Sequence, residues 1–363
     1  MWIYGSGGYA VKKIAIFQKD FQVGGIQRSL LSILEKLDYA KYSVDLYYFD
    51  DKPFFELPKR DKLNYIYCRP FPYYYRFLYF GLIRKLARFP FSGREYDLAV
   101  DFNSYSGECA AGALAVKADR RVEWIHNDMQ IKHASEPKYR VLWHFFKSKF
   151  KAFDEFCAVS PGIIDGFRKM TGLADAKVTV VQNYIDTDAI FKKAEEDTDF
   201  RPREEEYNLC TMGRLCHQKG FDILLDIMGD VVSRRQDMHL YIIGDGPDRD
   251  KLEKQISAGG LESHVTMLGN RQNPFPILRH MDGFALTSRY EGQGMVLWEA
   301  KSLGLELFAA KNLERYNPGI SGRDDMLSAL VGAEKREKTR DDLREYNDGI
   351  SRALDGVFDR ESR

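Results

Sequence analysis

The stretch Ser288–Gly304, SRYEGQGMVLWEAKSLG, decides the fold of this 363-residue chain. It continues the short apolar run GFALTS (283–288) and carries two glycines before a segment that we expect to become a helix near Met295. A short apolar strand, a glycine-bearing turn and a helix form the repeating unit of a parallel α/β sheet. The stretch therefore predicts an α/β fold with a polar loop at the carboxyl end of a strand.

Two glutamates in this stretch are placed for ligand binding. Glu291 is expected at the tip of the loop, facing a cleft. Glu299 is expected a little over one turn inside the helix, where a carboxylate can accept two hydrogen bonds from a vicinal diol such as a ribose. Backbone N–H groups at the start of that helix would form an anion cradle. The cradle residues are Gln293, Gly294, Met295 and Val296.

The same alternation of short apolar runs and amphipathic segments extends along the chain, which is typical of βα units. In the first half we predict strands at Lys13–Phe17, Val44–Phe49, Leu98–Phe102, Val122–Ile125, Glu155–Val159 and Val178–Val181. In the second half the runs are YNLCTMG (207–213), HLYIIG (239–244), VTMLG (265–269) and GFALTS (283–288). The pattern predicts two Rossmann-like domains, each with a parallel sheet.

A charged segment, KKAEEDTDFRPREEEY (192–207), separates the two sets of strands and indicates a linker. The length also favours two domains, because a chain of 363 residues is too long for one ordinary core. We expect an extension before regular patterning begins near residue 11, and a C-terminal helix that packs back toward the first domain. The expected parts are an N-terminal domain at 1–185, a linker at 186–206, a C-terminal domain at 207–345 and a last helix at 346–363.

Composition excludes several classes of protein. Hydrophobic residues make up 44% of the chain and charged residues 30%, as in a globular protein, and the net charge of zero does not favour nucleic acid. The five cysteines are spread without a CxxC pair, which argues against a disulfide framework and a zinc site. Because no long apolar run or signal peptide is recognisable, we expect a cytoplasmic location.

Two further loops carry groups suited to phosphate. Gly24 and Gly25 come directly before an amphipathic segment, where a backbone without side chains and a helix N-terminus can approach an anion. Arg214 and Lys219 follow the first strand of the second domain. A departing diphosphate needs fixed positive charge, and charge-assisted contacts of this kind contribute about 1.5–3 kcal/mol each.

The ordered set of motifs resembles family four of the retaining glycosyltransferases, and in particular bacterial enzymes that make cell-surface polysaccharides. The resemblance runs from about residue 13 to about residue 320. It rests on GGIQRS (24–29), WIHND (124–128), AVSPGI (158–163), MGRLCHQKG (212–220), IIGDGPDRDKLE (242–253), LGNRQNPFPIL (268–278) and SRYEGQGMVLWEA (288–300). It implies the GT-B fold, in which two Rossmann-like domains face each other across a cleft, with the donor on the second domain and the acceptor on the first.

The resemblance also implies roles for individual residues. Arg214 and Lys219 would hold the diphosphate, and Glu299 the ribose. Glu291 and the cradle would hold the transferred sugar and the β-phosphate, while Gly24 and Gly25 would close on the phosphates from the other side. His126 would lie beside the transferred sugar, and Arg271, Asn273 and Pro274 would border the base.

The function implied is that of a hexosyltransferase-type enzyme that moves a sugar from a nucleotide-diphosphate donor, with a UDP-sugar favoured, to a glycan or lipid-linked acceptor. We expect retention of anomeric configuration and no metal or other cofactor. The catalytic set would be Glu291, His126, Arg214 and Lys219. The alternative is a nucleotide-binding but inactive partner subunit of another glycosyltransferase. The hinge sequence Asn183–Asp186, Leu305 with Glu306, and YNPGISGRDDMLSAL (316–330) depart from the family pattern.

Other enzyme classes fit less well. The metal-dependent sugar transferases use Asp-x-Asp, but the two DTD triplets here, at 186–188 and 197–199, lie in the hinge and linker. A nicotinamide dehydrogenase needs G-x-G-x-x-G after a strand, and GDGPDRD (244–250) has only the first two glycines. The histidines lack the spacing of a metal site.

One segment of the first domain indicates membrane contact. Read as a helix, YYYRFLYFGLIRKLARFP (73–90) places apolar and basic residues on opposite sides. Its apolar face would carry Tyr75, Leu78, Tyr79, Leu82, Ile83, Leu86 and Phe89, and its basic face Arg76, Arg84, Lys85 and Arg88. A second basic and aromatic stretch is KYRVLWHFFKSKFKAF (138–153). Both stretches fit either an anionic membrane surface on the inner face of the cell membrane or simple packing on the sheet.

Overall fold

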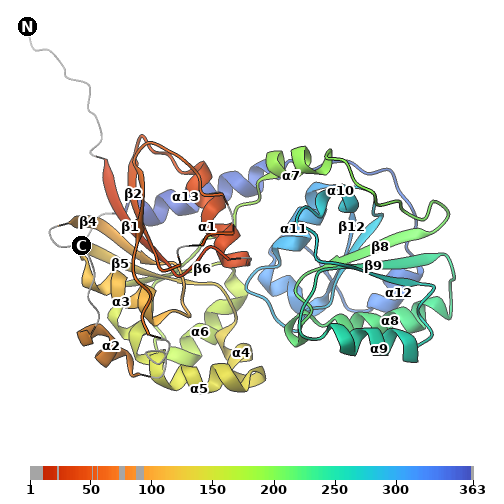
Figure 1. The fold of residues 1–363 in the computed structure, drawn as a ribbon, viewed down its shortest axis with the longest axis horizontal. Helices are drawn as coiled ribbons and strands as arrows, with labels where there is room; N and C mark the ends of the chain where they lie inside the picture. Colours follow the sequence, from red (N-terminus) through yellow and green to blue (C-terminus); the bar gives the residue numbers. More distant parts are fainter. Residues whose placement is uncertain are drawn as a thin grey trace, which may run out of the picture. The chain divides into compact units, whose positions relative to one another are not determined.

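The chain, described here by a computed structural model, forms two compact α/β units (Figure 1). The first unit comprises Met1–Tyr184 and Asp348–Arg363, and the second comprises Ile185–Asn347. The structure describes residues 11–22, 24–50, 52–54, 56–72, 78–86 and 94–360, and for 84–86 the backbone alone. The expected N-terminal extension, residues 1–10, lies outside this part of the chain.

The described part of the first unit contains a seven-stranded sheet in the order β3-β2-β1-β4-β5-β6-β7, with every pairing parallel. Its strands are β1 Lys12–Gln18, β2 Tyr42–Tyr48, β3 Leu63–Tyr67, β4 Glu95–Asp101, β5 Lys117–Ile125, β6 Glu155–Ala158 and β7 Val178–Val180. The six strands expected from the sequence are present. The unexpected one, β3, lies at the edge of the sheet and buries only Leu63 fully, so its apolar signal is weak.

Helices lie on both faces of this sheet, with α1 on the opposite face from α3 (Figure 1). The helices are α1 Gly25–Lys36, α2 Phe80–Leu86, α3 Gly107–Ala115, α4 Met129–Ser135, α5 Pro137–Phe146 and α6 Ile164–Thr171, with the 3-10 turns η2 Lys147–Ala152 and η3 Pro161–Ile163. Ser106 and Asp128 accept backbone hydrogen bonds as the N-caps of α3 and α4. These caps fix where the chain turns after β4 and β5.

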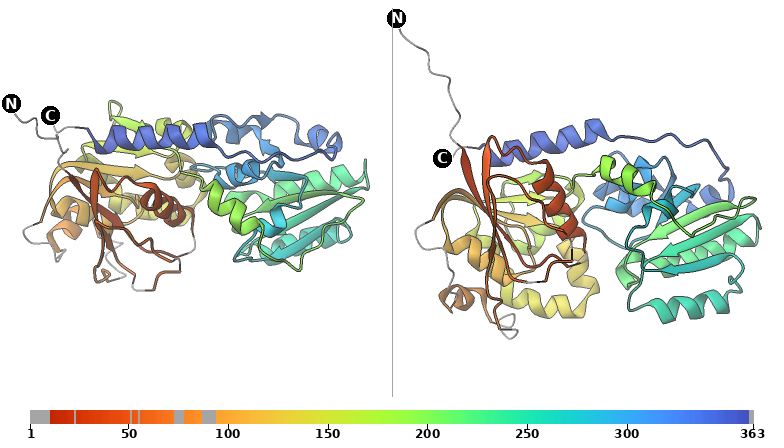
Figure 2. Two further views of the ribbon diagram at one scale, coloured as in Figure 1. Left: turned by 90° about the horizontal axis from the view of Figure 1, so that it is seen from above. Right: turned by 45° about the horizontal axis from the view of Figure 1, so that its top comes forward.

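The last helix, α13 (Arg344–Phe358), begins in the second unit and ends in the first (Figure 2). Arg120 of β5 pairs with Glu155 at 3.1 Å and donates to the carbonyl of Val357 at 3.1 Å. The ring of Phe358 meets that of Tyr42 edge to face, with centroids 5.6 Å apart. The end of α13 is therefore bound to strands of the first unit by both charge and packing.

The described part of the second unit contains a six-stranded parallel sheet in the order β10-β9-β8-β11-β12-β13. Its strands are β8 Tyr207–Met212, β9 Met238–Ile243, β10 Val265–Gly269, β11 Gly283–Leu286, β12 Glu306–Ala310 and β13 Gly322–Arg323. Its helices are α7 Thr187–Ala194, α8 Phe221–Val232, α9 Arg249–Ala258, α10 Phe275–Leu278, α11 Met295–Ser302 and α12 Met326–Val331, with η4 His217–Lys219 and η5 Lys311–Tyr316. Helix α7 lies within the segment expected as a linker, and Asp186 caps it by accepting from Ala189.

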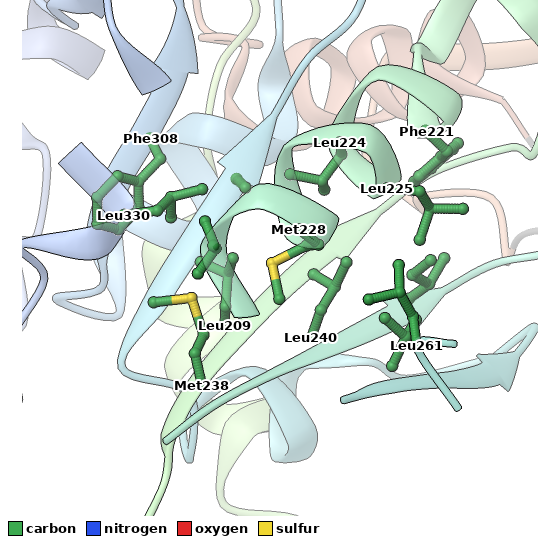
Figure 3. Packing of buried hydrophobic residues seen from close by; sticks show 14 of the residues in the cluster. Leu209, Phe221, Leu224, Leu225, Met228, Met238, Leu240, Leu261, Phe308 and Leu330 are labelled. Atoms are coloured by element: carbon green, nitrogen blue, oxygen red, sulfur yellow. The ribbon is translucent and has the colours of Figure 1, made fainter. Parts of the chain in front are cut away.

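The core of the second unit explains why its strands read as continuous apolar runs. Every residue of β8 and β9 is buried, as expected for central strands of a sheet covered on both faces. Leu224 and Met228 of α8 pack in one cluster with Leu209 and Leu240 of these strands (Figure 3). Burying a side chain of this size stabilises the fold by about 1.5–3 kcal/mol. The packed core fixes the carboxyl ends of the strands, where the polar loops begin.

The segment expected as a long amphipathic helix is helical only over α2 among its described residues. Ile83 is buried, whereas Tyr79 and Leu82 are 57% and 45% exposed, so the described apolar residues do not form one covered face. The remaining positions of the expected faces lie outside the described residues or side chains: Tyr75, Arg76, Arg84, Lys85, Leu86, Arg88 and Phe89. Among the described residues, none of the helices has the length and hydropathy to cross a bilayer.

Candidate active site

The loop after β8 is held against the end of β11 by a glycine. Gly220 has φ +64°, and a Cβ at this position would lie 2.2 Å from the carbonyl oxygen of Thr287, so only glycine fits. The hydroxyl of Thr287 in turn donates to the Gly220 carbonyl at 2.8 Å. This close approach brings two loops together that are far apart in the sequence.

Lys219 and Glu291 meet across these two loops. The Lys219 ammonium lies 2.7 Å from Glu291 Oε1, and the two side chains are 19% and 6% exposed. An ion pair this well covered is screened little by solvent. Two residues named from separate motifs thus form one charged centre at the carboxyl ends of β8 and β11.

A second ion pair, between Arg289 and Asp222, ties the same loops and was not expected from the sequence. The guanidinium donates to both carboxylate oxygens, at 2.8 Å and 2.7 Å, and also to the carbonyl of His217 at 2.8 Å. The hydrogen bond from Arg289 lowers the pKa of Asp222 to about 2. The sequence did carry a signal for this second pair, because Asp222 lies three residues after Lys219 and Arg289 lies two residues before Glu291.

The glycine-bearing loop before α11 is anchored by Asn317, another residue that the sequence did not single out. The N–H of Gly294 donates to Asn317 Oδ1 at 3.0 Å, and Asn317 donates to the carbonyl of Leu313 at 2.9 Å. The N–H of Met295 donates to the carbonyl of Gln293 at 3.0 Å. Two of the four amides expected to cradle an anion therefore already have acceptors in the chain.

Glu299 and its neighbour Trp298 lie one turn into α11. Glu299 is 1% exposed, so its carboxylate sits in a low-dielectric setting where polar partners matter most. The ring of Trp298 stacks on Tyr346 of α13, with centroids 4.1 Å apart. Tyr346 also accepts a hydrogen bond from the Gln293 side chain at 2.5 Å. Nothing local in the sequence around Tyr346 indicated this contact.

The other residues expected on the second unit are placed differently from one another. Arg214 and Arg271 are exposed, and neither forms an ion pair with a residue that the structure describes. Asn273 donates to the carbonyl of Lys193 at 2.9 Å and to Glu196 at 2.8 Å, so its amide is bound to the region of α7. Pro274 is the N-cap of α10.

The residues expected on the first unit lie at the carboxyl ends of its strands. Gly24 is the N-cap of α1, and a Cβ on Gly25 would meet nothing within 4 Å, so this backbone faces open space. His126 follows β5, and its Nε2–H donates to the Phe102 carbonyl at 2.9 Å. Burial lowers the pKa of His126 to about 3, so the imidazole is neutral at physiological pH.

Two family descriptions match consecutive parts of the chain. Residues 192–313 match glycosyl transferases group 1, and residues 23–189 match glycosyltransferase family 4. An uncharacterized glycosyltransferase of Haemophilus influenzae is 23% identical over 82% of this chain and 80% of its own length. The uncharacterized glycosyltransferase MJ1059 of Methanocaldococcus jannaschii is 29% identical over 37% of this chain, and the match spans only about a third of that protein (34%).

One relative has a more specific name. The N-acetylgalactosamine-N,N'-diacetylbacillosaminyl-diphospho-undecaprenol 4-alpha-N-acetylgalactosaminyltransferase of Campylobacter jejuni is 24% identical over 80% of this chain and 78% of its own length. Because its match covers both units, the similarity is not confined to one of them.

Solved structures share the fold. Anabaena HepE, in complex with UDP and glucose, superposes with a TM-score of 0.58 at 18% identity, covering 95% of this chain and 90% of that one. S. aureus TarM gives 0.60 at 12% identity, covering 96% and 97%. At sequence identities this low, the structural similarity establishes the GT-B fold and nothing about the ligands of this chain. With the two family matches and the relatives above, this similarity shows that this chain is a group 1 glycosyltransferase similar to bacterial enzymes of polysaccharide synthesis.

Proposed function

We propose that the enzyme takes its sugar from a nucleotide-diphosphate sugar, with UDP as the favoured nucleotide, and retains the anomeric configuration. The observation that carries the proposal is the largely buried ion pair of Lys219 and Glu291, which places a cation and a carboxylate together at the carboxyl ends of β8 and β11. Ligands of open α/β sheets bind outside the carboxyl ends of the strands. The complexes of HepE with UDP and with UDP-glucose support the choice of donor.

In this proposal Lys219 changes partner when the donor binds. The ammonium is held by Glu291 at 2.7 Å, and a diphosphate would compete with that carboxylate for it. Arg214, exposed on the same loop, would add a second cation as charge develops on the departing phosphate. The displaced Glu291 carboxylate would then accept hydrogen bonds from sugar hydroxyls. Glu299 would hold the ribose of the nucleotide.

Retention would follow from attack on the face that the phosphate leaves, with that phosphate taking the acceptor proton. The transition state would carry oxocarbenium character, and the fixed cations would stabilise the departing charge. NMR of the product from UDP-glucose, or from the donor that a thermal-shift panel selects, tests this. An inverted anomeric carbon would refute the retaining mechanism.

We further propose that the acceptor is a glycan or a lipid-linked sugar used in cell-surface polysaccharide synthesis. The name of the Campylobacter relative, which contains a diphospho-undecaprenol acceptor, supports the lipid-linked class. A panel of nucleotide sugars in a thermal-shift assay is the first experiment, since a ligand at 100 times its Kd adds about 2.7 kcal/mol of stability. A chain that responds to none of them would instead be an inactive partner subunit.

The last part of the proposal is docking of the first unit on an anionic membrane surface. Tyr79, Leu82 and Val141 are 57%, 45% and 55% exposed, and the ring of Tyr79 lies 5.4 Å from that of Phe145 on α5. Exposed Lys138, Arg140 and Lys147 lie on or next to α5, which carries Val141. Apolar and basic side chains side by side suit the interface of an anionic bilayer.

A further inference from the structure

The first unit contains a cavity of about 290 Å³ that the donor site does not use. Part of its wall is formed by Lys19, directly after β1, and by Ser106 with Gly107, where α3 begins after β4. β1 and β4 are neighbours, and the strand order reverses between them because β2 and β3 continue on the other side of β1. This is the point of an open α/β sheet where ligands bind.

Most of the remaining wall is apolar. Leu78 and Ile83 line it from the region of α2, and Leu142 and Phe146 line it from α5. The two regions are packed together, since the Tyr79 hydroxyl lies 3.0 Å from His144 Nε2 and its ring centroid 5.4 Å from that of Phe145. Apolar side chains of this kind can pack against a hydrocarbon group, and mostly apolar walls with a few polar groups are usual for ligand pockets.

Two lysines supply positive charge at the same cavity. Lys19 is half-buried and Lys138 is exposed, and neither pairs with a carboxylate of the described residues. Among the described lining residues the one acidic group is Glu108, which accepts a hydrogen bond from the N–H of Phe71 at 2.6 Å. The cavity therefore offers two ammonium groups to an anion, next to an apolar surface.

Large apolar side chains are also exposed next to the lining residues. Tyr79, Leu82 and Val141, each directly beside a lining residue in the sequence, are 57%, 45% and 55% exposed.

We propose that this cavity binds the acceptor as a phosphorylated apolar chain, with the chain between α2 and α5 and the phosphate at Lys19 and Lys138. The proposal rests on the proposed function in taking this ligand to be the acceptor. Chain and phosphate are both needed, because apolar burial supplies affinity and the lysines fix the register of the head group.

Calorimetric titration of the full chain tests the proposal with three probes: farnesyl diphosphate, dodecyl phosphate and inorganic pyrophosphate. We expect farnesyl diphosphate to bind at least about tenfold more tightly than pyrophosphate. Dodecyl phosphate carries a straight chain and a single phosphate, so tighter binding of dodecyl phosphate than of pyrophosphate would show that the chain supplies affinity without a second phosphate. Equal affinity for pyrophosphate and both chain-bearing probes would overturn the proposal.

Matched variants separate the cavity from the surface around it. Leu142→Trp fills the cavity and should weaken farnesyl diphosphate at least about tenfold, whereas Val141→Trp changes the exposed neighbour and should not. Lys138→Ala changes an exposed side chain and should weaken binding of farnesyl diphosphate and of pyrophosphate alike. Identical affinities in all three variants would also overturn it.

UDP titration of the same variants distinguishes this proposal from the donor assignment. Unchanged UDP affinity shows that the donor residues in the other unit are intact, and a melting temperature equal to that of the wild type shows that the first unit of each variant is folded. UDP binding without farnesyl diphosphate binding would remove the cavity proposal and leave the donor proposal standing. Farnesyl diphosphate binding without any nucleotide-sugar binding would remove the donor proposal and show that the cavity binds its ligand independently of it.

Discussion

The side-chain amide of Gln293 donates a 2.5 Å hydrogen bond to the phenol oxygen of Tyr346. Gln293 lies in the glycine-bearing loop before α11, and Tyr346 lies in the first turn of α13. The next residue, Asn347, exchanges two hydrogen bonds with the backbone of Ile185, at 3.2 Å and 2.9 Å. The chain passes between the two units directly beside Ile185 and Asn347. The loop before α11 is therefore bound to α13 one residue before the chain leaves the second unit.

Removing the Tyr346 hydroxyl should make the loop before α11 more mobile without unfolding the protein. Tyr346→Phe keeps the ring that stacks on Trp298 but leaves the Gln293 amide without this acceptor. Since a hydrogen bond contributes about 0.5–1.5 kcal/mol net, we expect the KM for the donor to rise about two- to tenfold with little change in melting temperature. Tyr67→Phe, at a tyrosine of the first unit that is 45% exposed, is the control. An unchanged donor KM in Tyr346→Phe would show that this contact does not position the loop.

Lys219→Ala and Glu299→Ala should each lower turnover of the donor at least about tenfold, equivalent to about 1.4 kcal/mol. Lys219→Ala removes a cation and also leaves Glu291, whose side chain is 6% exposed, without its partner. The matched control is Lys254→Ala on α9, because Lys254 is exposed and lies outside the proposed site. Steady-state kinetics with the selected nucleotide sugar measures the effect, and wild-type rates in both site variants would refute the assigned roles.

Sequence reasoning located the polar loops because they follow strands with strong apolar patterns. The run YNLCTM is buried throughout, so its end, and with it Arg214 and Lys219, could be read directly. The strands β3, β12 and β13 were missed, because a strand that buries few side chains or spans two residues leaves little pattern. The strength of the prediction therefore followed the burial of each element.

Contacts between loops could not be predicted in the same way. Lys219 and Glu291 were each proposed for a ligand, but their mutual ion pair depends on Gly220, whose missing Cβ lets the two loops touch. Asn317 was missed because the stretch that contains it, residues 316–330, departs from the family pattern. Its side chain binds a backbone N–H, a role that no motif indicates. Such contacts depend on how loops distant in sequence meet, which periodicity does not reveal.

A buried charged triad in the first unit leads to a stability prediction. Lys149 lies 3.0 Å from Asp101 and 2.8 Å from Glu123, and all three side chains are 0% exposed. Removing one partner of a buried ion pair typically costs about 3–5 kcal/mol. We expect Lys149→Met to be destabilised by about that amount at pH 7.5 in chemical denaturation, while Lys151→Met, exposed on the same 3-10 turn, should match the wild type.

The loss in Lys149→Met should shrink as the pH falls. Burial raises the pKa of Asp101, and burial together with the charge of Asp101 raises that of Glu123. Without the lysine the folded protein would bind more protons than the unfolded chain over the range between the unfolded and folded pKa values, so stability would decrease as the pH rises. Denaturation at pH 5.5 should recover part of the loss seen at pH 7.5. Equal losses at both values would mean that the carboxyls do not take up protons.

Chelation should leave activity intact in the proposed mechanism. Lys219 and Arg214 would supply the positive charge that a divalent ion supplies in the metal-dependent transferases. We expect the initial rate in EDTA to equal that in buffer with manganese. Complete loss in EDTA that manganese restores would refute the metal-independent mechanism.

The membrane proposal is tested by cosedimentation with vesicles. Anionic lipids attract each nearby Lys or Arg by about 1 kcal/mol, so the basic residues around α5 acting together could hold the enzyme reversibly at low salt. We expect binding to anionic but not to neutral vesicles, weakened by salt because surface charges are screened.

Arg84→Glu with Lys85→Glu should reduce binding through charge, and Leu82→Glu with Val141→Glu should reduce it through lost apolar contact at two positions that are 45% and 55% exposed. Ile223→Glu changes an exposed apolar residue of α8 in the other unit and should bind like the wild type, so it controls for a general effect of added negative charge. Equal indifference to both lipid types, or equal losses in all three variants, would contradict docking through the first unit.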